Sequence, residues 1–277
     1  MQPLVSVCIP AYNNAAYIKE TIDAILHQTY KNLELVICDD KSTDDTIAVI
    51  EAIDDARIRL YKNEQNLGMS GNWNNCLSKC TGEYIKLICA DDLLTENALE
   101  LEVKALEEHP EAVLVESDTT LLDLDGKAKG SYKRYDPHGK NGLYDGKKIA
   151  RDGLFVKNYF GAPLANTFRR SILEKLGGFD TDYHYILDYD FWVRAACLGQ
   201  VYIIHEPLNF FRVRNDSNTG EVMAGDKTNA YVKEHELLLS KHRDVLKLSD
   251  ADVKRSVRIR KLRNFAGSMY LKLLVHK

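Results

Sequence analysis

The chain has the length and composition of an ordinary folded protein. Its 277 residues include 45% hydrophobic and 28% charged side chains and only 6 prolines, which excludes the disordered and fibrous classes. A chain of this length buries about three-quarters of its unfolded surface, enough for one large domain or a domain with an appendage. The formal net charge of −4 argues against a general nucleic-acid-binding protein, which needs a basic excess.

The sequence shows no targeting segment and no spanning helix. Residues 5–9 begin a strand-like run almost at once, without the basic and long apolar stretches of a signal peptide. No apolar run approaches the roughly 18 residues that a membrane span needs. The 6 cysteines lie mostly in apolar runs and form no C-x-x-C pair, which indicates buried thiols in a reducing compartment. We therefore expect a cytoplasmic protein, associated at most with the inner face of the membrane.

Strand and helix patterns alternate through the first 90 or so residues. Short apolar runs that end at proline or at carboxylates are typical of buried strands, and apolar residues at helical spacing lie between them. The polar residues 63–71 are expected to form a loop. Strands are expected at residues 4–9, 33–38, 58–61 and 84–89, and helices at 17–27, 46–53 and around 73–77. This alternation predicts an α/β fold with a doubly wound, mostly parallel (mixed) sheet flanked by helices.

The second half of the chain is less regular. Residues 126–146 are polar and lose periodicity, so we expect a mobile loop of the kind that forms lids. Asp125-Gly126, at its start, predicts a type I′ hairpin turn. Helices are expected at 95–109, 149–159, 170–176, 188–198 and beyond 226, and strands at 112–117, 164–168, 201–204 and 208–213.

Two of the expected strands end on adjacent carboxylates. Asp39 and Asp40 follow one strand, and Asp91 and Asp92 follow another. In open α/β sheets, ligands bind beyond the carboxyl ends of the strands. Two neighbouring carboxylates need a counter-charge, and a divalent cation that also contacts phosphate oxygens is the usual one. The alternative for Asp91 and Asp92 is a helix cap, because a helical pattern opens at Thr95.

Motifs in a fixed order resemble those of one enzyme family. They are Val-Ser-Val-Cys-Ile-Pro-Ala-Tyr-Asn at 5–13, Leu-Val-Ile-Cys-Asp-Asp-Lys-Ser-Thr-Asp-Asp-Thr at 35–46, Asn-Leu-Gly-Met-Ser-Gly-Asn-Trp-Asn at 66–74, Cys-Ala-Asp-Asp at 89–92, Leu-Asp-Tyr-Asp-Phe-Trp-Val-Arg at 187–194 and Pro-Leu-Asn-Phe-Phe-Arg-Val-Arg at 207–214. Each motif alone is weak. The ordered set resembles the family 2 inverting glycosyltransferases of GT-A fold, a large bacterial family that uses nucleotide sugars.

The resemblance implies transfer of a sugar from a UDP-sugar to a hydroxyl of a saccharide or lipid-linked saccharide, in the synthesis of bacterial surface glycans. dTDP and GDP donors stay open. It also implies a Mg²⁺ or Mn²⁺ ion at Asp91 and Asp92. Asp188 would be the general base, with Asp190 as the substitute. The donor would be bound by residues from several motifs: Pro10, Ala11, Tyr12, Asn13, Asp39, Asn66, Gly68, Asn72, Asp91, Arg212 and Arg214.

These residue types suit that chemistry. A uracil imide N–H needs an acceptor such as the Asp39 carboxylate. Tyr12 is either a ring that covers the base or a half-buried loop residue. Charge that develops on the leaving diphosphate would be stabilised by the cation, with Arg212 or Arg214 nearby. Attack assisted by Asp188, on the face opposite the leaving group, inverts the anomeric carbon in one step.

Three positions depart from the family's pattern. Cys89 stands where an acid is common, Arg214 where many members have a histidine, and Leu187 where a glutamate precedes the base. Because a guanidinium cannot ligate a cation, either the metal has fewer protein ligands or Arg214 contacts the diphosphate directly. These departures leave an alternative, a non-catalytic nucleotide-sugar-binding or scaffold protein of the same fold. A sugar-phosphate nucleotidyltransferase is disfavoured, because residues 10–14 contain neither Gly nor Lys.

The resemblance also suggests how the chain is divided. We expect a glycosyltransferase domain at 1–225, with a nucleotide-binding half at 1–118 and an acceptor half at 119–225, followed by a helical extension at 226–277. Residues 250–277 carry eight Lys and Arg against two Asp. This tail is either a solvated helical face or a peripheral attachment to anionic membrane. In the second interpretation apolar side chains would enter the lipid interface: Phe265, Tyr270, Leu271, Leu273 and Leu274.

Overall fold

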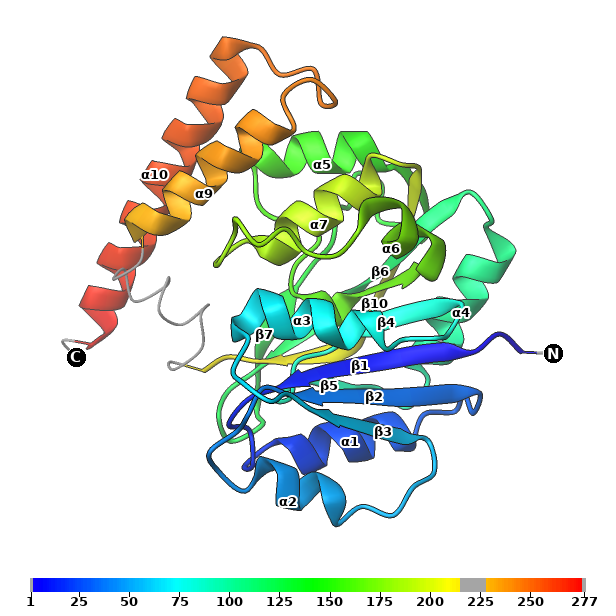
Figure 1. Ribbon diagram of the computed structural model, residues 1–277. Helices are drawn as coiled ribbons and strands as arrows, with labels where there is room; N and C mark the ends of the chain where they lie inside the picture. The colour runs from blue at the N-terminus through cyan, green and yellow to red at the C-terminus, as the bar shows by residue number, and fades with distance from the viewer. Residues whose placement is uncertain (1, 215–227, 276–277) are drawn as a thin grey trace.

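The computed structural model in Figure 1 is built around one mixed sheet. It describes residues 2–214 and 228–275, and the side chains of residues 2–214 and 229–263. In this part of the chain the strand order is β3-β2-β1-β4-β9-β6-β10-β5, with β7 paired to β6 and β8 to β10. The strands are β1 (Val5–Ala11), β2 (Leu33–Asp39), β3 (Ile58–Lys62), β4 (Tyr84–Leu87), β5 (Leu93–Leu94), β6 (Ala112–Leu122), β7 (Ala128–Tyr132), β8 (Gly142–Asp145), β9 (Asn166–Arg169) and β10 (Gln200–Arg212).

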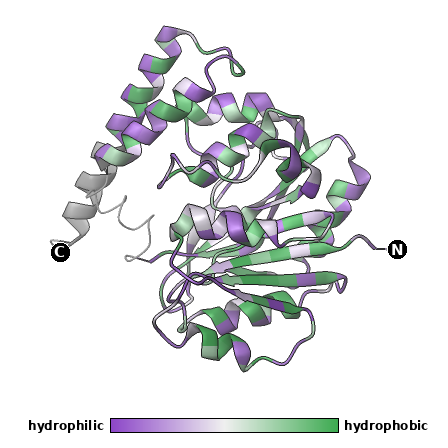
Figure 2. Ribbon diagram, in the orientation of Figure 1, coloured by the Kyte–Doolittle hydropathy of each residue, from purple (hydrophilic) through white to green (hydrophobic). Residues whose placement is uncertain are grey.

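Helices cover both faces of the sheet. α1 and α4 pack on one face, and α3, α5 and α7 pack on the other. Figure 2 shows that hydrophobic residues are concentrated along the central strands, as expected for strands buried on both sides. The helices are α1 (Ile18–Leu26), α2 (Thr46–Glu51), α3 (Gly68–Ser78), α4 (Ala98–Glu108), α5 (Gly146–Phe155), the 3-10 helix η1 (Pro163–Ala165), α6 (Arg170–Leu176), α7 (Leu187–Ala196), α9 (Thr228–Lys241) and α10 (Asp250–Val275).

The sheet has a parallel half and a mixed half. β1 lies between β2 and β4 and runs parallel to both, and β3 is parallel to β2. β9 then pairs antiparallel with β4 and with β6, whereas β10 is parallel to β6. Because the strands of the parallel half point the same way, the residues that follow β1, β2 and β4 meet at one edge of the sheet.

Strand β1 continues past Pro10, where the sequence predicted its end. Pro10 pairs with Cys38 of β2, and Ala11 pairs with Asp39. On the other side of β1 the pairing with β4 stops at Cys8 and Leu87. Pro10 therefore lies beyond the end of β4, where its missing N–H removes no ladder hydrogen bond.

The polar region 126–146 is not a single long loop. β7 pairs with the long strand β6, and β8 pairs with β10, because both neighbours extend beyond the central sheet and offer free edges. The hairpin between β6 and β7 is confirmed, but its turn is not type I′. Gly126 has φ +76° while Asp125 does not adopt a positive φ. Asp123 O accepts the Gly126 N–H at 3.1 Å, so the loop is a tight turn followed by a left-handed glycine.

Three other predicted boundaries were wrong. α3 begins at Gly68, inside the loop expected at 63–71. The two strands expected at 201–204 and 208–213 form the single strand β10, which has register shifts near Pro207. The two-residue strand β5 was missed, since its pairing with β10 is a tertiary contact that no local pattern encodes.

Helices α9 and α10 form a C-terminal extension that packs on α5 (Figure 1). Arg151 of α5 donates to Leu246 O at 2.6 Å and to Asp252 at 3.1 Å. Ser256 of α10 donates to Leu154 O at 2.8 Å. Among the described residues, no helix is both long and apolar enough to cross a membrane.

A buried ion pair joins the two halves of the sheet. Lys86 of β4 and Glu102 of α4 are fully buried, with Nζ 2.7 Å from the carboxylate. Thr167 of β9 and Ser117 of β6 also donate to Glu102, at 2.7 and 3.0 Å. One carboxylate thus satisfies polar groups of three neighbouring strands. A buried charge is tolerated only when it is paired and hydrogen-bonded in this way.

We expect Glu102→Ala to lower the free energy of unfolding by about 3–5 kcal/mol, because it leaves the Lys86 ammonium buried without its counter-charge. Glu108→Ala is the matched control on the same helix. Its carboxylate lies 3.9 Å from Lys104 with both side chains exposed, so we expect a loss below about 1 kcal/mol. Urea unfolding measures both. Equal losses in the two variants would contradict the structural role of the buried pair.

Candidate active site

The loops after β1 and β2 are tied to each other. Asn13 has the left-handed φ of +52°, which asparagine tolerates better than most residues. Its N–H donates to Ser42 Oγ at 2.9 Å, and its side-chain oxygen accepts the Thr43 N–H at 2.8 Å. Asn14 N–H donates to Thr46 Oγ1 at 2.8 Å. These contacts fix the two loops as one surface, from which the Tyr12 side chain projects with 48% of its surface exposed.

Asp39 lies at the base of this surface. It is the last residue of β2 and is fully buried. One carboxylate oxygen accepts the Ser42 N–H at 2.9 Å, and the other accepts the Ser42 hydroxyl at 2.5 Å. Each oxygen retains a second lone pair, but a ligand would reach it only after the loop that carries Ser42 moves.

Some of the predicted donor-binding residues form hydrogen bonds inside the protein that hold the strand ends and loops of the site in place. Asn72 donates to Cys38 O at 3.0 Å and to Ala11 O at 3.4 Å, so it joins the ends of β2 and β1. Asn66 donates to Asp40 O and accepts the N–H of Gly68, each at 3.0 Å. Pro10 and Ala11 remain in the sheet. The polar groups of these residues are used inside the protein.

Asp91 and Asp92 follow β4 at the same edge. Asp92 is buried, and its Oδ1 accepts the Arg212 N–H at 3.0 Å. Its Oδ2 is buried without a hydrogen-bond partner. Asp91 Oδ2 lies 3.2 Å from the Arg214 guanidinium. Burial raises the pKa of both carboxyl groups, opposed at Asp91 by Arg214 and reinforced at Asp92 by the Asp91 charge.

Arg212 and Arg214 are held over one aromatic ring. Their guanidinium carbons lie 5.0 and 4.8 Å from the centre of the Tyr17 ring, within cation–π range. Arg212 also donates to Glu20 at 2.8 Å and to Asp91 O at 3.1 Å. The sequence analysis missed Tyr17 and Glu20. Tyr17 and Glu20 are three residues apart, which places them on one face of the helix that follows the first loop. This spacing was visible in the sequence, but the face that carries Tyr17 was interpreted as apolar packing.

Asp188 lies in the first turn of α7 and is partly exposed. Its Oδ1 accepts the Tyr189 N–H at 2.8 Å. Burial of the carboxyl raises its pKa to about 7. Asp188 and the acids that follow β4 act on the same thiol. The pKa of Cys89 is raised first by burial and then by the charges of Asp92, Asp91 and Asp188. All three carboxylates therefore lie close enough to the Cys89 thiol for their charges to act on it.

Asp190, the substitute for Asp188, faces elsewhere. It is buried, with Arg194 Nε at 2.8 Å and His242 Nε2 at 2.7 Å. One of its oxygens is bound within α7 by Arg194, and the other contacts His242, the residue that follows α9. The geometry gives Asp188 and Asp190 different tasks.

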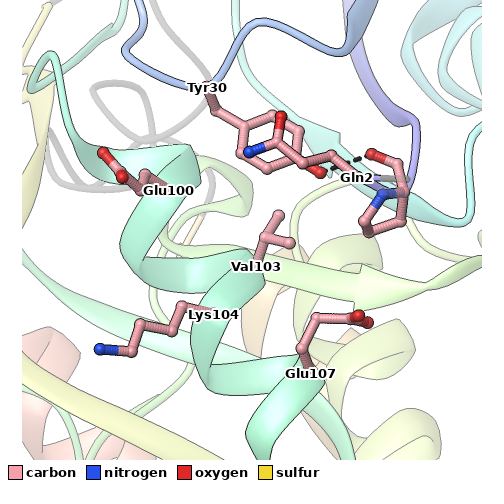
Figure 3. Close-up of a pocket in the computed structure, with 7 residues that line it drawn as sticks. Gln2, Tyr30, Glu100, Val103, Lys104 and Glu107 are labelled. Atoms are coloured by element: carbon pink, nitrogen blue, oxygen red, sulfur yellow. Dashed lines mark hydrogen bonds between the residues drawn. The ribbon is translucent and has the colours of Figure 1, made fainter.

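The groove in Figure 3 is not part of this site. It has a volume of about 490 Å³ and lies at the opposite edge of the sheet, where β1 and β2 begin. Its floor is α4, and Tyr30 donates to the backbone of Pro3 at its rim. The lining residues are Gln2, Pro3, Tyr30, Glu100, Val103, Lys104 and Glu107.

Solved structures share this arrangement of strands and helices. S. aureus TarS in complex with UDP-GlcNAc is similar with a TM-score of 0.71 and 17% identity over 95% of this chain and 72% of TarS. The mannosyltransferase PcManGT from Pyrobaculum calidifontis, in complex with GDP-Man and Mn²⁺, gives a TM-score of 0.66 and 21% identity over 98% and 74% of the two chains. The fold is the GT-A fold, as the sequence predicted.

Sequence comparison places the chain within that class. It is 32% identical over 223 residues to an uncharacterized glycosyltransferase of Haemophilus influenzae, covering 78% of this chain and 68% of the relative. It is 28% identical to the Campylobacter jejuni GalNAc(5)-diNAcBac-PP-undecaprenol beta-1,3-glucosyltransferase, over 97% and 86% of the two chains. The model of glycosyl transferase family 2 matches residues 6–177, and the chain belongs to this family. It is a glycosyltransferase that takes sugar from a nucleotide sugar.

Proposed function

We propose that this enzyme transfers a sugar from a UDP-sugar, with inversion, to a hydroxyl of a saccharide or lipid-linked saccharide in bacterial surface glycan synthesis. The observation that carries the proposal is the set of carboxylates at the carboxyl edge of the sheet: Asp92 Oδ2 is buried without a hydrogen-bond partner, Asp91 lies beside it, and the charges of both and of Asp188 act on the Cys89 thiol. The UDP-GlcNAc bound by TarS supports the donor. The lipid-linked glycan in the name of the Campylobacter relative supports the acceptor.

The donor base would bind on the surface formed by the first two loops. Asp39 would accept the imide N–H of uracil, a charge-assisted hydrogen bond that favours a base with a donor at that position. The exposed Tyr12 ring would cover the base. Asn72 and Asn66 would act indirectly, since they hold the ends of β1 and β2 and the following loop in place.

The carboxylates after β4 fit a hard divalent cation. Asp92 Oδ2 is a buried oxygen without a partner, and Asp91 offers a second carboxylate beside it. The described residues contain no group of three or more His, Cys, Asp or Glu side chains that could hold a metal alone. Mg²⁺ and Mn²⁺ are commonly held by one or two carboxylates together with substrate phosphates. When bound, the cation would stabilise charge on the leaving diphosphate, and Arg214 would add a further positive charge.

Asp188 would act as the general base. An acceptor hydroxyl has a pKa far above neutral, so it needs a carboxylate within hydrogen-bond reach to take its proton. A base whose pKa is about 7 takes a proton more readily than an ordinary aspartate and is still substantially ionised at neutral pH. Attack from the side of Asp188, opposite the diphosphate, gives the inverted product without a covalent intermediate.

We expect Asp188→Asn to lower the transfer rate by about 10²–10⁴-fold, because it removes the proton acceptor, while UDP affinity stays unchanged. In the wild-type enzyme the rate should rise with pH up to about 7 and then level off, since only the ionised carboxylate accepts a proton. A UDP-release assay across pH and calorimetry with UDP measure the two effects. Asp54→Asn, at an exposed carboxylate, is the control. Near-normal transfer by Asp188→Asn would remove Asp188 from the base role.

We expect Asp91→Asn to weaken Mn²⁺-dependent UDP binding by at least about tenfold, because it removes a charged oxygen ligand. Calorimetric titration with UDP, with and without Mn²⁺, separates the cation-dependent part of the affinity from the rest. Asp54→Asn again serves as the control. A Mn²⁺ titration identical to that of the wild-type enzyme would contradict the assignment of the cation to this site.

We also propose that the C-terminal extension contacts anionic membrane. A groove of about 630 Å³ between α9 and α10 is lined by apolar side chains, by three exposed basic ones, Lys254, Arg258 and Lys261, and by Glu236, which lies 3.6 Å from Lys261. Leu262 beside them is 58% exposed. The apolar residues 265, 270, 271, 273 and 274 of the sequence analysis lie outside the described side chains. A basic rim around apolar surface suits a leaflet that carries a lipid-linked acceptor.

Charge reversal tests this contact. We expect Lys254→Glu, Arg258→Glu and Lys261→Glu together to weaken co-sedimentation with phosphatidylserine vesicles by at least about a hundredfold, because each basic residue contributes about 1 kcal/mol near an anionic surface. Charge reversal of Lys19, Lys104 and Lys129, which lie outside the C-terminal extension, should leave the co-sedimentation unchanged. Equal binding of both triple variants, or wild-type binding to neutral vesicles of the same strength, would contradict the proposal.

A further inference from the structure

The helix that carries Asp188 begins without a cap of its own. Ile186 occupies the N-cap position of α7 and makes no side-chain cap hydrogen bond. The first backbone N–H groups of a helix have no partner within the helix and must find one elsewhere. Asp188 lies in this first turn, so the position of its carboxylate depends on how the turn is held.

The backbone that leads into the helix, up to and including its N-cap residue, is held by the C-terminal extension. Glu234 of α9 accepts the N–H of His184 at 2.9 Å on one oxygen, and the N–H groups of Tyr185 and Ile186 at 2.8 and 3.1 Å on the other. Three successive backbone donors thus converge on one carboxylate about 50 residues away in sequence. A negative charge at the amino end of a helix also interacts favourably with the helix dipole.

Two further contacts from α9 flank the same segment. Before Asp188, the Lys241 ammonium lies 2.6 Å from Asp180 and 2.7 Å from Asp182. After it, His242 Nε2 lies 2.7 Å from Asp190. Residues 180–190 are therefore attached, on both sides of Asp188, to α9 and to the residue that follows it, and Glu234 holds the backbone directly before α7.

We propose that Glu234 is a positioning residue for Asp188 and that, through it, the C-terminal extension sets the geometry of the general base. The inference rests on the proposed role of Asp188. The family model covers residues 6–177, and both Glu234 and the segment it binds lie outside that range. Misplacement of a reacting group by about 1 Å can lower a rate by about a hundredfold, so one hydrogen-bonding side chain is sufficient for a large effect.

The decisive comparison uses Glu234→Ala, Glu234→Gln and the control Asp244→Ala, an exposed carboxylate just beyond α9. In the full-length Glu234→Ala enzyme we expect faster amide hydrogen exchange at residues 184–186. We expect kcat to fall at least about tenfold, with the donor KM unchanged. The rise of kcat with pH should move to lower pH, because a loosened turn admits water to Asp188 and removes part of its burial. Cys89, Asp91 and Asp92, the titratable groups on the β4 side, are the same in all variants.

Glu234→Gln should lie between the wild-type enzyme and Glu234→Ala, because its carbonyl oxygen still accepts while its amide nitrogen cannot. Asp244→Ala should match the wild type in exchange, kcat and pH profile. Unchanged exchange at 184–186, or faster exchange with kcat and the pH profile unaltered, would overturn the inference. Failure of the proposed function is separate, since it would appear as transfer activity in Asp188→Asn.

Discussion

The concentration of carboxylates around Cys89 is the constraint on which the rest of the site depends. The charges of Asp91, Asp92 and Asp188 all act on this thiol, and burial raises the pKa of all three carboxyl groups. Like charges in such a place favour protonation unless positive charge is near. Arg214 supplies one positive charge at 3.2 Å from Asp91. A divalent cation that brings a diphosphate would add more positive charge on the side where the leaving group departs.

Two separate parts of the molecule support this site. The acids after β4 depend on the sheet, where the buried pair of Lys86 and Glu102 fixes β4 against its neighbours. Asp188 depends on α9, which holds the turn before it through Glu234. The two supports come from the family 2 region and from the C-terminal extension.

The sequence was sufficient to predict the fold class and the main acids of the site, for physical reasons. Buried parallel strands have a short apolar pattern that ends abruptly, so Asp39 and Asp91 could be located at strand ends from local sequence alone. Asp188 was chosen because the motif at 187–194 resembles the family's segment that carries the base, and the apolar residues that follow it placed it at the start of a helix. These signals are local, and the parallel topology converts them into spatial proximity.

The features that could not be predicted depend on distant partners. Glu234 is one of two glutamates on α9, and only tertiary packing shows that it accepts from residues 184–186. The strands β7 and β8 were mistaken for a loop because their exposed residues lack an apolar alternation, and their pairing depends on the free edges of β6 and β10. The turn at Gly126 was assigned to the wrong type, since a dipeptide does not determine the number of loop residues around it.

The central claim is that the acids after β4 and the base on α7 enclose one diphosphate and the sugar it carries. Crystals of the full chain grown with UDP and Mn²⁺, measured at the manganese absorption edge, test it directly. The account requires an anomalous peak in contact with Asp91 or Asp92 and with the diphosphate oxygens. It also requires that Asp188 line the open face of the site that the sugar would occupy. A peak away from both carboxylates, or UDP bound at another edge of the sheet, would contradict it.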